Sequence, residues 1–364
     1  MKYFARSLVL LGLILAIAVV AGCGSSPATP QSGAPTSQPG TPATAAGKVT
    51  LILGAYTTPQ EAYGKIIPLF KKMWKDKTGQ DVEFQESYLG SGAQARAIVN
   101  GFEADIAALS LAGDIQTIVK AGLITHDWTT KGTKGMVSDS VVVLAVRKGN
   151  PKGIKDWNDL TQKGLDILTP DPKTSGGAQW NIMAMYGAAK RGFVTGVTKD
   201  DDQAAQGFVK NVLKNVSVLD KGARESITNY EKGVGDVAIT YENEAIVGRQ
   251  AGQTYDYIIP RSTILIENPI AVVDKNVDKH GTRVVAEAFR DFLFTKDIQR
   301  VFAQYGLRSV DPTVAQETKG QYPDVQDLFP IDYFGGWSQV TQPFFGNDGI
   351  YSKLMDQVQQ EKGQ

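Results

Sequence analysis

Short apolar strands alternate with helices along most of this 364-residue chain, and this alternation limits the possible folds more than any other feature. A strand expected at 49–53 is followed by a helix that ends near Lys75, and a strand at 81–86 is followed by another helix. The same alternation returns between residues 165 and 240. Strands that are joined through helices usually pair in parallel. The sequence therefore predicts an α/β fold with parallel sheets covered by helices.

Four strand-to-helix turns carry small residues that leave a helix N-terminus open to approach. In the clearest, Ser175-Gly176-Gly177 follows an apolar strand at 165–168. The first N–H groups of a helix have no acceptor inside it, and the helix dipole adds partial positive charge there. Such a turn suits a small oxyanion, although an ordinary serine-capped helix is the alternative interpretation. The other turns are Thr57-Thr58, where Thr58 and Glu61 have capping-box spacing, Gly90-Ser91-Gly92 and Gly222-Ala223-Arg224.

The composition argues against several classes of function. The chain has 38 Lys+Arg and 38 Asp+Glu residues, so it has no net charge with which to attract nucleic acid. Its 2 histidines, His126 and His280, lie far apart and lack Cys or carboxylate neighbours at ligand spacing. We therefore expect no metal site and no cofactor. An exported hydrolase with Ser91 or Ser175 as nucleophile stays an alternative, but neither serine lies in a Gly-x-Ser-x-Gly elbow.

The N-terminal segment has the pattern of an export signal. Lys2 and Arg6 precede an uncharged apolar run at 8–20, which is short for a membrane span and fits the core of a signal peptide. Val20-Ala21-Gly22-Cys23 resembles the lipobox of bacterial lipoproteins. This likeness implies that a signal peptide, residues 1–22, is removed and that Cys23 is lipidated; an ordinary secretory signal with a stray thiol is the alternative. Residues 23–47 are rich in Pro, Ser, Thr and Gly, which predicts a flexible tether.

Several stretches occur in an order that resembles the sulfate-binding proteins of bacterial ABC importers. Besides the lipobox and the four turns, they are Arg147-Lys148-Gly149-Asn150-Pro151-Lys152, Asp156-Trp157-Asn158-Asp159-Leu160, Pro172-Lys173-Thr174, Val218-Leu219-Asp220-Lys221, Glu242-Asn243-Glu244-Ala245 and Phe334-Gly335-Gly336-Trp337. The likeness extends from about residue 49 to residue 337. It implies a two-lobed periplasmic-binding-protein fold of type II, in which each lobe is a mainly parallel sheet flanked by helices and the ligand lies between the lobes.

On this plan, lobe 1 comprises residues 48–138 and 266–364, and lobe 2 comprises residues 139–265. Two apolar strands, at 138–147 and 264–273, are where the chain is expected to cross between the lobes. Closure of the lobes on a ligand would bend the chain at these strands.

The resemblance also implies which residues hold the anion. In this family sulfate is bound mainly by backbone N–H groups, together with a serine hydroxyl and an indole N–H. The corresponding residues here are Thr57, Ser91, Ser175, Gly176, Gly177, Ala223 and Tyr241, with Ser91 as the source of the hydroxyl. Two positions differ from the family: Thr57-Thr58-Pro59 replaces an Asp-Pro-Thr, and Tyr241 replaces a Trp. A phenol can donate one hydrogen bond from a shorter ring, while a tyrosine that only packs is the alternative.

We therefore expect a monomeric, non-catalytic lipoprotein that captures sulfate or thiosulfate and delivers it to an ABC permease. It would be anchored to a membrane only through Cys23, in the periplasm or at the outer face of the cytoplasmic membrane. A fully deprotonated dianion has only acceptors, so a site made only of donors suits it. Molybdate, tungstate and phosphate are the alternative ligands. Arg224 is expected either to balance the charge of the anion or to be an ordinary surface residue.

Overall fold

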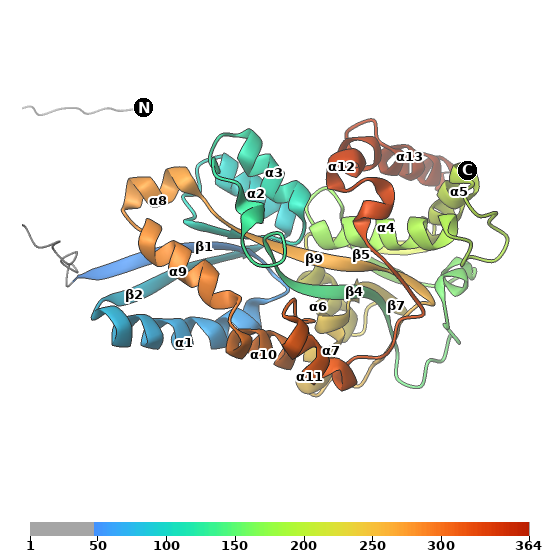
Figure 1. Cartoon of the computed structure of the whole chain (residues 1–364). Coiled ribbons are helices and arrows are strands. Elements are labelled where there is room, and N and C mark those ends of the chain that lie inside the picture. Colours follow the sequence, from blue (N-terminus) through green and yellow to red (C-terminus); the bar gives the residue numbers. More distant parts are fainter. Residues whose placement is uncertain (1–46, 364) are drawn as a thin grey trace, which may run out of the picture. The chain divides into compact units, whose positions relative to one another are not determined.

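Two long strands, β4 (Met136–Val146) and β9 (Ser262–Val272), form the centre of the fold in this computed structural model, which describes residues 47–363 (Figure 1). They pair with each other in antiparallel fashion between residues 136–141 and 265–269. Beyond this region β9 pairs with β3, and β4 pairs with β7. Both strands expected as crossing points are thus present, and we call β4 and β9 the shared strands.

The first strand group consists of the parallel strands β1 (Lys48–Tyr56), β2 (Asp81–Leu89) and β3 (Ile106–Ala108). Successive residues of a strand point to opposite faces. Leu51 and Leu53 pack against α1 (Gln60–Thr78), α9 (Arg283–Leu293) and α10 (Lys296–Gln304). Ile52 packs on the opposite face with α2 (Ser91–Val99) and α3 (Ala112–Lys120), so helices cover both faces (Figure 1).

The second strand group consists of β5 (Ile167–Pro170), β6 (Val216–Asp220) and β7 (Val237–Tyr241), which are parallel to one another. Successive residues of β4 again point to opposite faces of the sheet, so the core has two sides. Val142 and Leu144 face α4 (Gly176–Lys190) and α5 (Asp202–Leu213). Val143 and Ala145 face α6 (Ala223–Glu231) and α7 (Glu242–Gln250).

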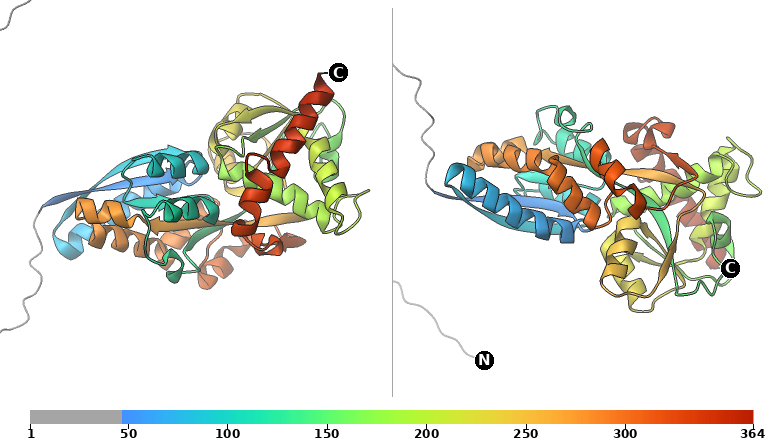
Figure 2. Two further views of the ribbon diagram at one scale, coloured as in Figure 1. Left: turned by 90° about the horizontal axis from the view of Figure 1, so that it is seen from above. Right: turned by 60° about the horizontal axis from the view of Figure 1, so that its bottom comes forward.

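The last two helices, α12 (Trp337–Phe345) and α13 (Ile350–Lys362), pack on the second strand group beside α4 and α5 (Figures 1 and 2). The indole ring of Trp337 meets that of Trp180 edge to face, with 4.6 Å between ring centroids. The division into lobes, 48–138 with 266–364 and 139–265, stays a prediction. In the hydrophobic core, however, these two helices group with residues of the second strand group, because their apolar side chains cover α4.

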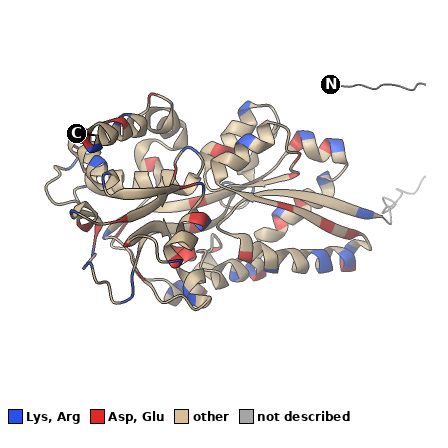
Figure 3. Cartoon of the chain, turned by 180° about the vertical axis from the view of Figure 1, so that it is seen from behind, with Lys and Arg blue, Asp and Glu red and all other residues tan. Residues whose placement is uncertain are grey.

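The remaining strands and α-helices are short. They are β8 (Asp256–Ile258), α8 (Asp274–His280), α11 (Pro312–Thr318) and β10 (Asp327–Phe329). Residues 47–363 include no helix that is long and apolar enough to cross a membrane. Lys and Arg are interspersed with Asp and Glu along this part of the chain (Figure 3). The predicted signal peptide (1–22), Cys23 and the tether up to residue 46 lie outside the described residues.

Candidate anion-binding site

The expected turns meet where the two strand groups face each other. Gly90, at the start of α2, packs so tightly that a Cβ atom on it would lie 2.6 Å from the carbonyl oxygens of both Thr174 and Lys221. The N–H of Ala93 donates to that same Thr174 oxygen at 3.1 Å. A Cβ on Gly222 would lie 3.7 Å from Oγ1 of Thr57. The structure thus brings these turns, which lie far apart in the sequence, into contact.

The start of α4 presents N–H groups that the helix itself does not use. Its first internal hydrogen bond runs from the N–H of Gln179 to the carbonyl of Ser175, and Ala178 donates to Oγ of Ser175 at 3.4 Å. The N–H groups of Gly176 and Gly177 therefore have no acceptor inside α4, and both residues are buried.

Two other helices repeat this arrangement. In α6 the first internal bond runs from the N–H of Ser226 to the carbonyl of Gly222, which leaves the N–H of Ala223 without an acceptor in the helix. In α2 the N–H of Gln94 donates to the carbonyl of Gly90, so the N–H of Ser91 has no acceptor in that helix. Ser91, Ser175 and Ala223 are all 5% exposed or less. Buried N–H groups need a partner, and a bound anion would supply one.

Ser91 does not offer its hydroxyl proton. Its Oγ donates to Oδ2 of Asp114 at 2.5 Å and accepts from the N–H of Ser110 at 2.9 Å. What Ser91 has left for a ligand is its backbone N–H. The hydroxyl of Ser175, by contrast, only accepts a bond from Ala178, so its own proton is not used there.

Asp114 is buried and lies near the candidate site, but it was not among the expected site residues. Burial raises its pKa to about 6, against the opposing effects of the Ser91 hydrogen bond and of Arg96. One signal could have identified it: Asp114 lies in the first turn of the helix that follows β3, at the same sheet edge as the expected turns. Its carboxyl group accepts the hydroxyl proton of Ser91 and so contacts one of the expected site residues.

Tyr241 ends β7 and is 1% exposed. Its ring packs against the start of α4, because a Cβ on Gly177 would lie 2.6 Å from Cε2 of the ring. Its hydroxyl makes a hydrogen bond of 2.5 Å with Oγ of Ser110. Burial raises the pKa of Tyr241 well above its ordinary value, so the phenol stays protonated and keeps one proton to donate.

Arg224 is neither a surface residue nor a free positive charge. Its Nε donates to Oε2 of Glu244 at 2.7 Å, and its Nη2 donates to Glu61 at 2.8 Å and to the carbonyl of Thr58 at 3.2 Å. Glu61 therefore pairs with Arg224 and does not form the predicted capping box, and no side chain caps α1. Two carboxylates balance this one guanidinium, so an anion at the candidate site would be attracted mainly by the dipoles of the helix N-termini.

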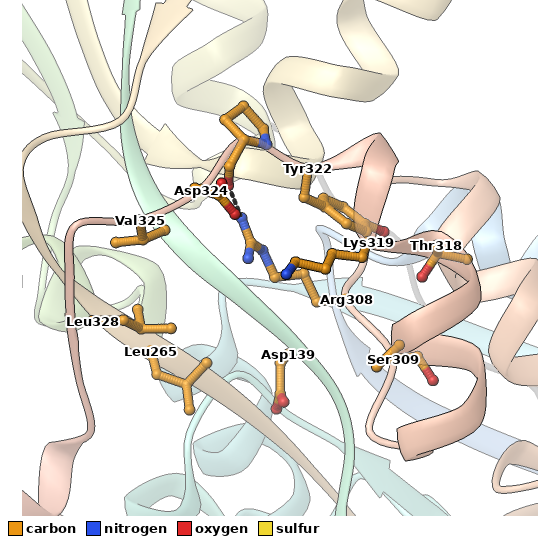
Figure 4. Close-up of a pocket in the computed structure, with 12 residues that line it drawn as sticks. Asp139, Leu265, Arg308, Ser309, Thr318, Lys319, Tyr322, Asp324, Val325 and Leu328 are labelled. Carbon is orange, nitrogen blue, oxygen red and sulfur yellow. Dashed lines mark hydrogen bonds between the residues drawn. The ribbon is translucent and has the colours of Figure 1, made fainter.

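Other hollows lie elsewhere on the molecule. One, with a volume of about 290 Å³, lies beside Arg308, Tyr322 and Asp139 of β4 (Figure 4). None of the seven expected contact residues lines it. Residues 47–363 contain no group of three or more His, Cys, Asp or Glu side chains that could hold a metal ion. The donor groups at the helix N-termini thus remain the candidate site.

Comparisons with known proteins agree with this architecture. Residues 51–308 match the family model described as bacterial extracellular solute-binding protein. A sulfate-binding protein of Synechococcus elongatus is 46% identical over 313 residues, 85% of this chain and 87% of the relative. A thiosulfate-binding protein of Escherichia coli is 34% identical over 311 residues, 84% of this chain and 90% of the relative.

The structure is also similar to that of the sulfate-binding protein SubI from Mycobacterium tuberculosis, with a TM-score of 0.74 and 36% identity over 82% of this chain and 99% of that one. This match confirms the predicted two-lobed α/β fold of type II periplasmic binding proteins. The chain therefore belongs to the bacterial extracellular solute-binding proteins, in the group that contains the sulfate-binding proteins.

Proposed function

We propose that this protein captures sulfate, or the related thiosulfate, outside the cytoplasm and delivers it to an ABC permease. One observation carries the proposal: the buried residues Gly176, Gly177 and Ala223 have N–H groups without acceptors in their own helices, and a Cβ on Gly177 would lie 3.3 Å from Cβ of Ala223. The similarity to proteins named for sulfate and thiosulfate binding supports the choice of ligand.

The chemistry of the donors favours a fully deprotonated dianion. Sulfate offers only acceptors, and backbone N–H groups offer only donors, so every bond can be satisfied. In this proposal the contacts are the N–H groups of the four turns, the hydroxyl of Ser175 and the hydroxyl of Tyr241. Ser91 takes part through its N–H, because its hydroxyl proton is held by Asp114. Molybdate, tungstate and phosphate, the alternative ligands, are not favoured by the similarity to sulfate-binding and thiosulfate-binding proteins.

In this proposal the protein works outside the cytoplasm, attached to a membrane. The signal peptide (1–22) would be removed, Cys23 would be lipidated, and residues 24–47 would tether the binding domain to the membrane. The protein would act as a monomer, without a cofactor and without catalysis. Its two lobes would close on the anion by bending at the shared strands β4 and β9.

Calorimetric titration of the mature protein with an oxyanion panel tests the ligand directly. The panel is sulfate, thiosulfate, molybdate, tungstate and phosphate at one ionic strength. Sulfate or thiosulfate is expected to bind at one site per chain and more tightly than the other three. Tighter binding of molybdate or phosphate would mean that the proposed ligand is wrong. Hydrolysis of a sulfate or phosphate ester by the same sample would instead support the enzyme alternative.

A further inference from the structure

Ser110 is a buried residue beside the candidate site, and it was not among the expected site residues. It follows β3 and is 0% exposed. Its backbone is held from both sides: its N–H donates to Oγ of Ser91 at 2.9 Å. Its carbonyl oxygen accepts from the indole N–H of Trp180 at 3.0 Å and from the amide of Asn268 at 2.9 Å. Its side-chain hydroxyl makes a hydrogen bond of 2.5 Å with the hydroxyl of Tyr241.

Both hydroxyl groups lie beside the buried start of α4. A Cβ on Gly176 would lie 2.8 Å from Oγ of Ser110, and a Cβ on Gly177 would lie 3.3 Å from Oη of Tyr241. These are the two glycines whose N–H groups have no acceptor inside the helix. An anion bound by these N–H groups would have the two hydroxyls as close neighbours.

The pair of hydroxyls has one proton to spare. Each hydroxyl carries one proton, and one of the two protons is used in the bond between Ser110 and Tyr241. Neither hydroxyl oxygen has another hydrogen-bond partner among residues 47–363. The pair can therefore donate once to a ligand. Because hydroxyl oxygens also carry lone pairs, the same pair can rotate and accept a bond from a ligand that bears a proton.

We infer that Ser110 and Tyr241 act as one reversible hydrogen-bonding unit of the anion site. The unit donates to a fully deprotonated oxyanion such as sulfate, and it accepts from a proton-bearing oxyanion such as hydrogen phosphate. An indole N–H at position 241 could only donate. The parent protein is therefore expected to discriminate less strongly against hydrogen phosphate than a variant with Trp at this position. This inference rests on the proposed function, since it requires an oxyanion at the start of α4.

The first test is a double-mutant cycle for sulfate binding. The proteins are the parent, Ser110→Ala, Tyr241→Phe and the double variant, titrated by calorimetry. Each single change removes the bond between the two hydroxyls and frees the proton of the hydroxyl that remains, so sulfate binding is expected to weaken only about twofold to threefold. The double variant is expected to bind about tenfold more weakly than the parent, because the pair supplies a single donor to the charged ligand and only this variant lacks it. A loss of about a hundredfold in the double variant would show two independent donors and overturn the inference.

The second test concerns the accepting role. Hydrogen phosphate is titrated at about pH 8 into the parent and into the combined variant Ser110→Ala with Tyr241→Trp. The ratio of sulfate affinity to phosphate affinity is expected to rise about tenfold in the combined variant, because its indole offers phosphate no acceptor. An unchanged ratio, or a parent that does not bind hydrogen phosphate at all, would overturn the accepting role.

A matched control separates loss of the hydroxyl pair from general damage to the fold. Ser140→Ala removes another serine hydroxyl that is 0% exposed, from the shared strand β4, and its Oγ has no hydrogen-bond partner in the described residues. Sulfate affinity should not change in this variant. If all the variants bind sulfate as the parent does, the inference fails while the proposed function stands. If the parent binds no oxyanion, the proposed function fails, and the inference with it.

Discussion

Nη2 of Arg224 lies 2.8 Å from Oε2 of Glu61, and this ion pair joins α6 of the second strand group to α1 of the first. Arg224 also holds Glu244, which is 2% exposed, within its own strand group. Arg224 thus pairs with Glu244 inside the second strand group and with Glu61 of the first strand group. The pair with Glu61 can form only while the two groups are in contact. The two halves of this network should therefore respond differently to substitution.

Glu61→Gln removes only the partner across the interface. Because Glu61 is partly exposed, we expect a modest effect: sulfate binding should weaken about twofold to fivefold, with little change in the free energy of unfolding. Calorimetry and urea denaturation measure the two quantities. Glu83→Gln is the control, because it breaks the Lys71–Glu83 ion pair inside the first strand group. Equal effects of the two substitutions on sulfate binding would contradict the role of Glu61 in holding the groups together.

Arg224→Met should behave differently, because it leaves Glu244 buried without a charged partner. Loss of one partner of a buried ion pair lowers the free energy of unfolding by about 3–5 kcal/mol. Urea denaturation should show this loss in the absence of any ligand. A change below about 1 kcal/mol would mean that Glu244 takes up a proton or finds water instead.

Gly90→Ala tests whether the observed close contact is needed for binding. The added methyl group would lie 2.6 Å from two backbone oxygens, those of Thr174 and Lys221. The φ angle of Gly90 is −57°, which alanine adopts without strain, so the free energy of unfolding should change little if the groups can separate. We expect sulfate affinity to fall at least about tenfold, since the turns can no longer approach each other. Gly64→Ala, where no atom lies within 4 Å of the added Cβ, should leave sulfate affinity unchanged.

Asp114→Asn should alter how stability depends on pH. Burial raises the pKa of Asp114 from 3.8 to about 6, so the folded protein binds this proton more tightly than the unfolded chain does. The resulting stability is present below about pH 4 and is lost as the pH rises through about 6. The loss corresponds to about 3 kcal/mol. Relative to the parent, the asparagine variant should therefore gain about this much free energy of unfolding between pH 4 and pH 7.5. Parallel pH profiles would refute a buried, titrating Asp114.

Cys23→Ala tests the membrane anchor. Lipidated Cys23 should place the mature protein in the detergent phase after phase partitioning, whereas the alanine variant should be released or remain unprocessed. Mass spectrometry of the mature N-terminus would identify the acyl groups. Membrane association that persists after this substitution would exclude Cys23 as the attachment point.

Local chemistry explains what the sequence made predictable. Ser175-Gly176-Gly177 predicts an open helix start because the requirement for small residues and a capping serine is met within a few positions. The shared strands are likewise visible as long apolar runs. The site residues themselves stay predictions, although the structure places their turns together.

What the sequence did not predict depends on contacts between distant residues. Ser110 is separated from Tyr241 by 131 positions, and no pattern in the sequence near either residue predicts their contact. The predicted capping box at Thr58 and Glu61 fails for the same reason, because Arg224 from another helix competes for the Glu61 carboxylate. Asp114 was missed because its burial comes from packing rather than from its neighbours in the sequence.

The shared strands also have a consequence for the order of folding during export. Ile106 of β3 pairs with Val272 of β9, so the first strand group lacks its inner edge until nearly three quarters of the chain has been translocated. Contacts between such distant residues are slow to form, since a long loop must be closed before they contribute any stability. The first strand group should therefore stay protease-sensitive through most of translocation. A chain truncated before β9 is expected to stay trapped in that sensitive state rather than to yield a stable half.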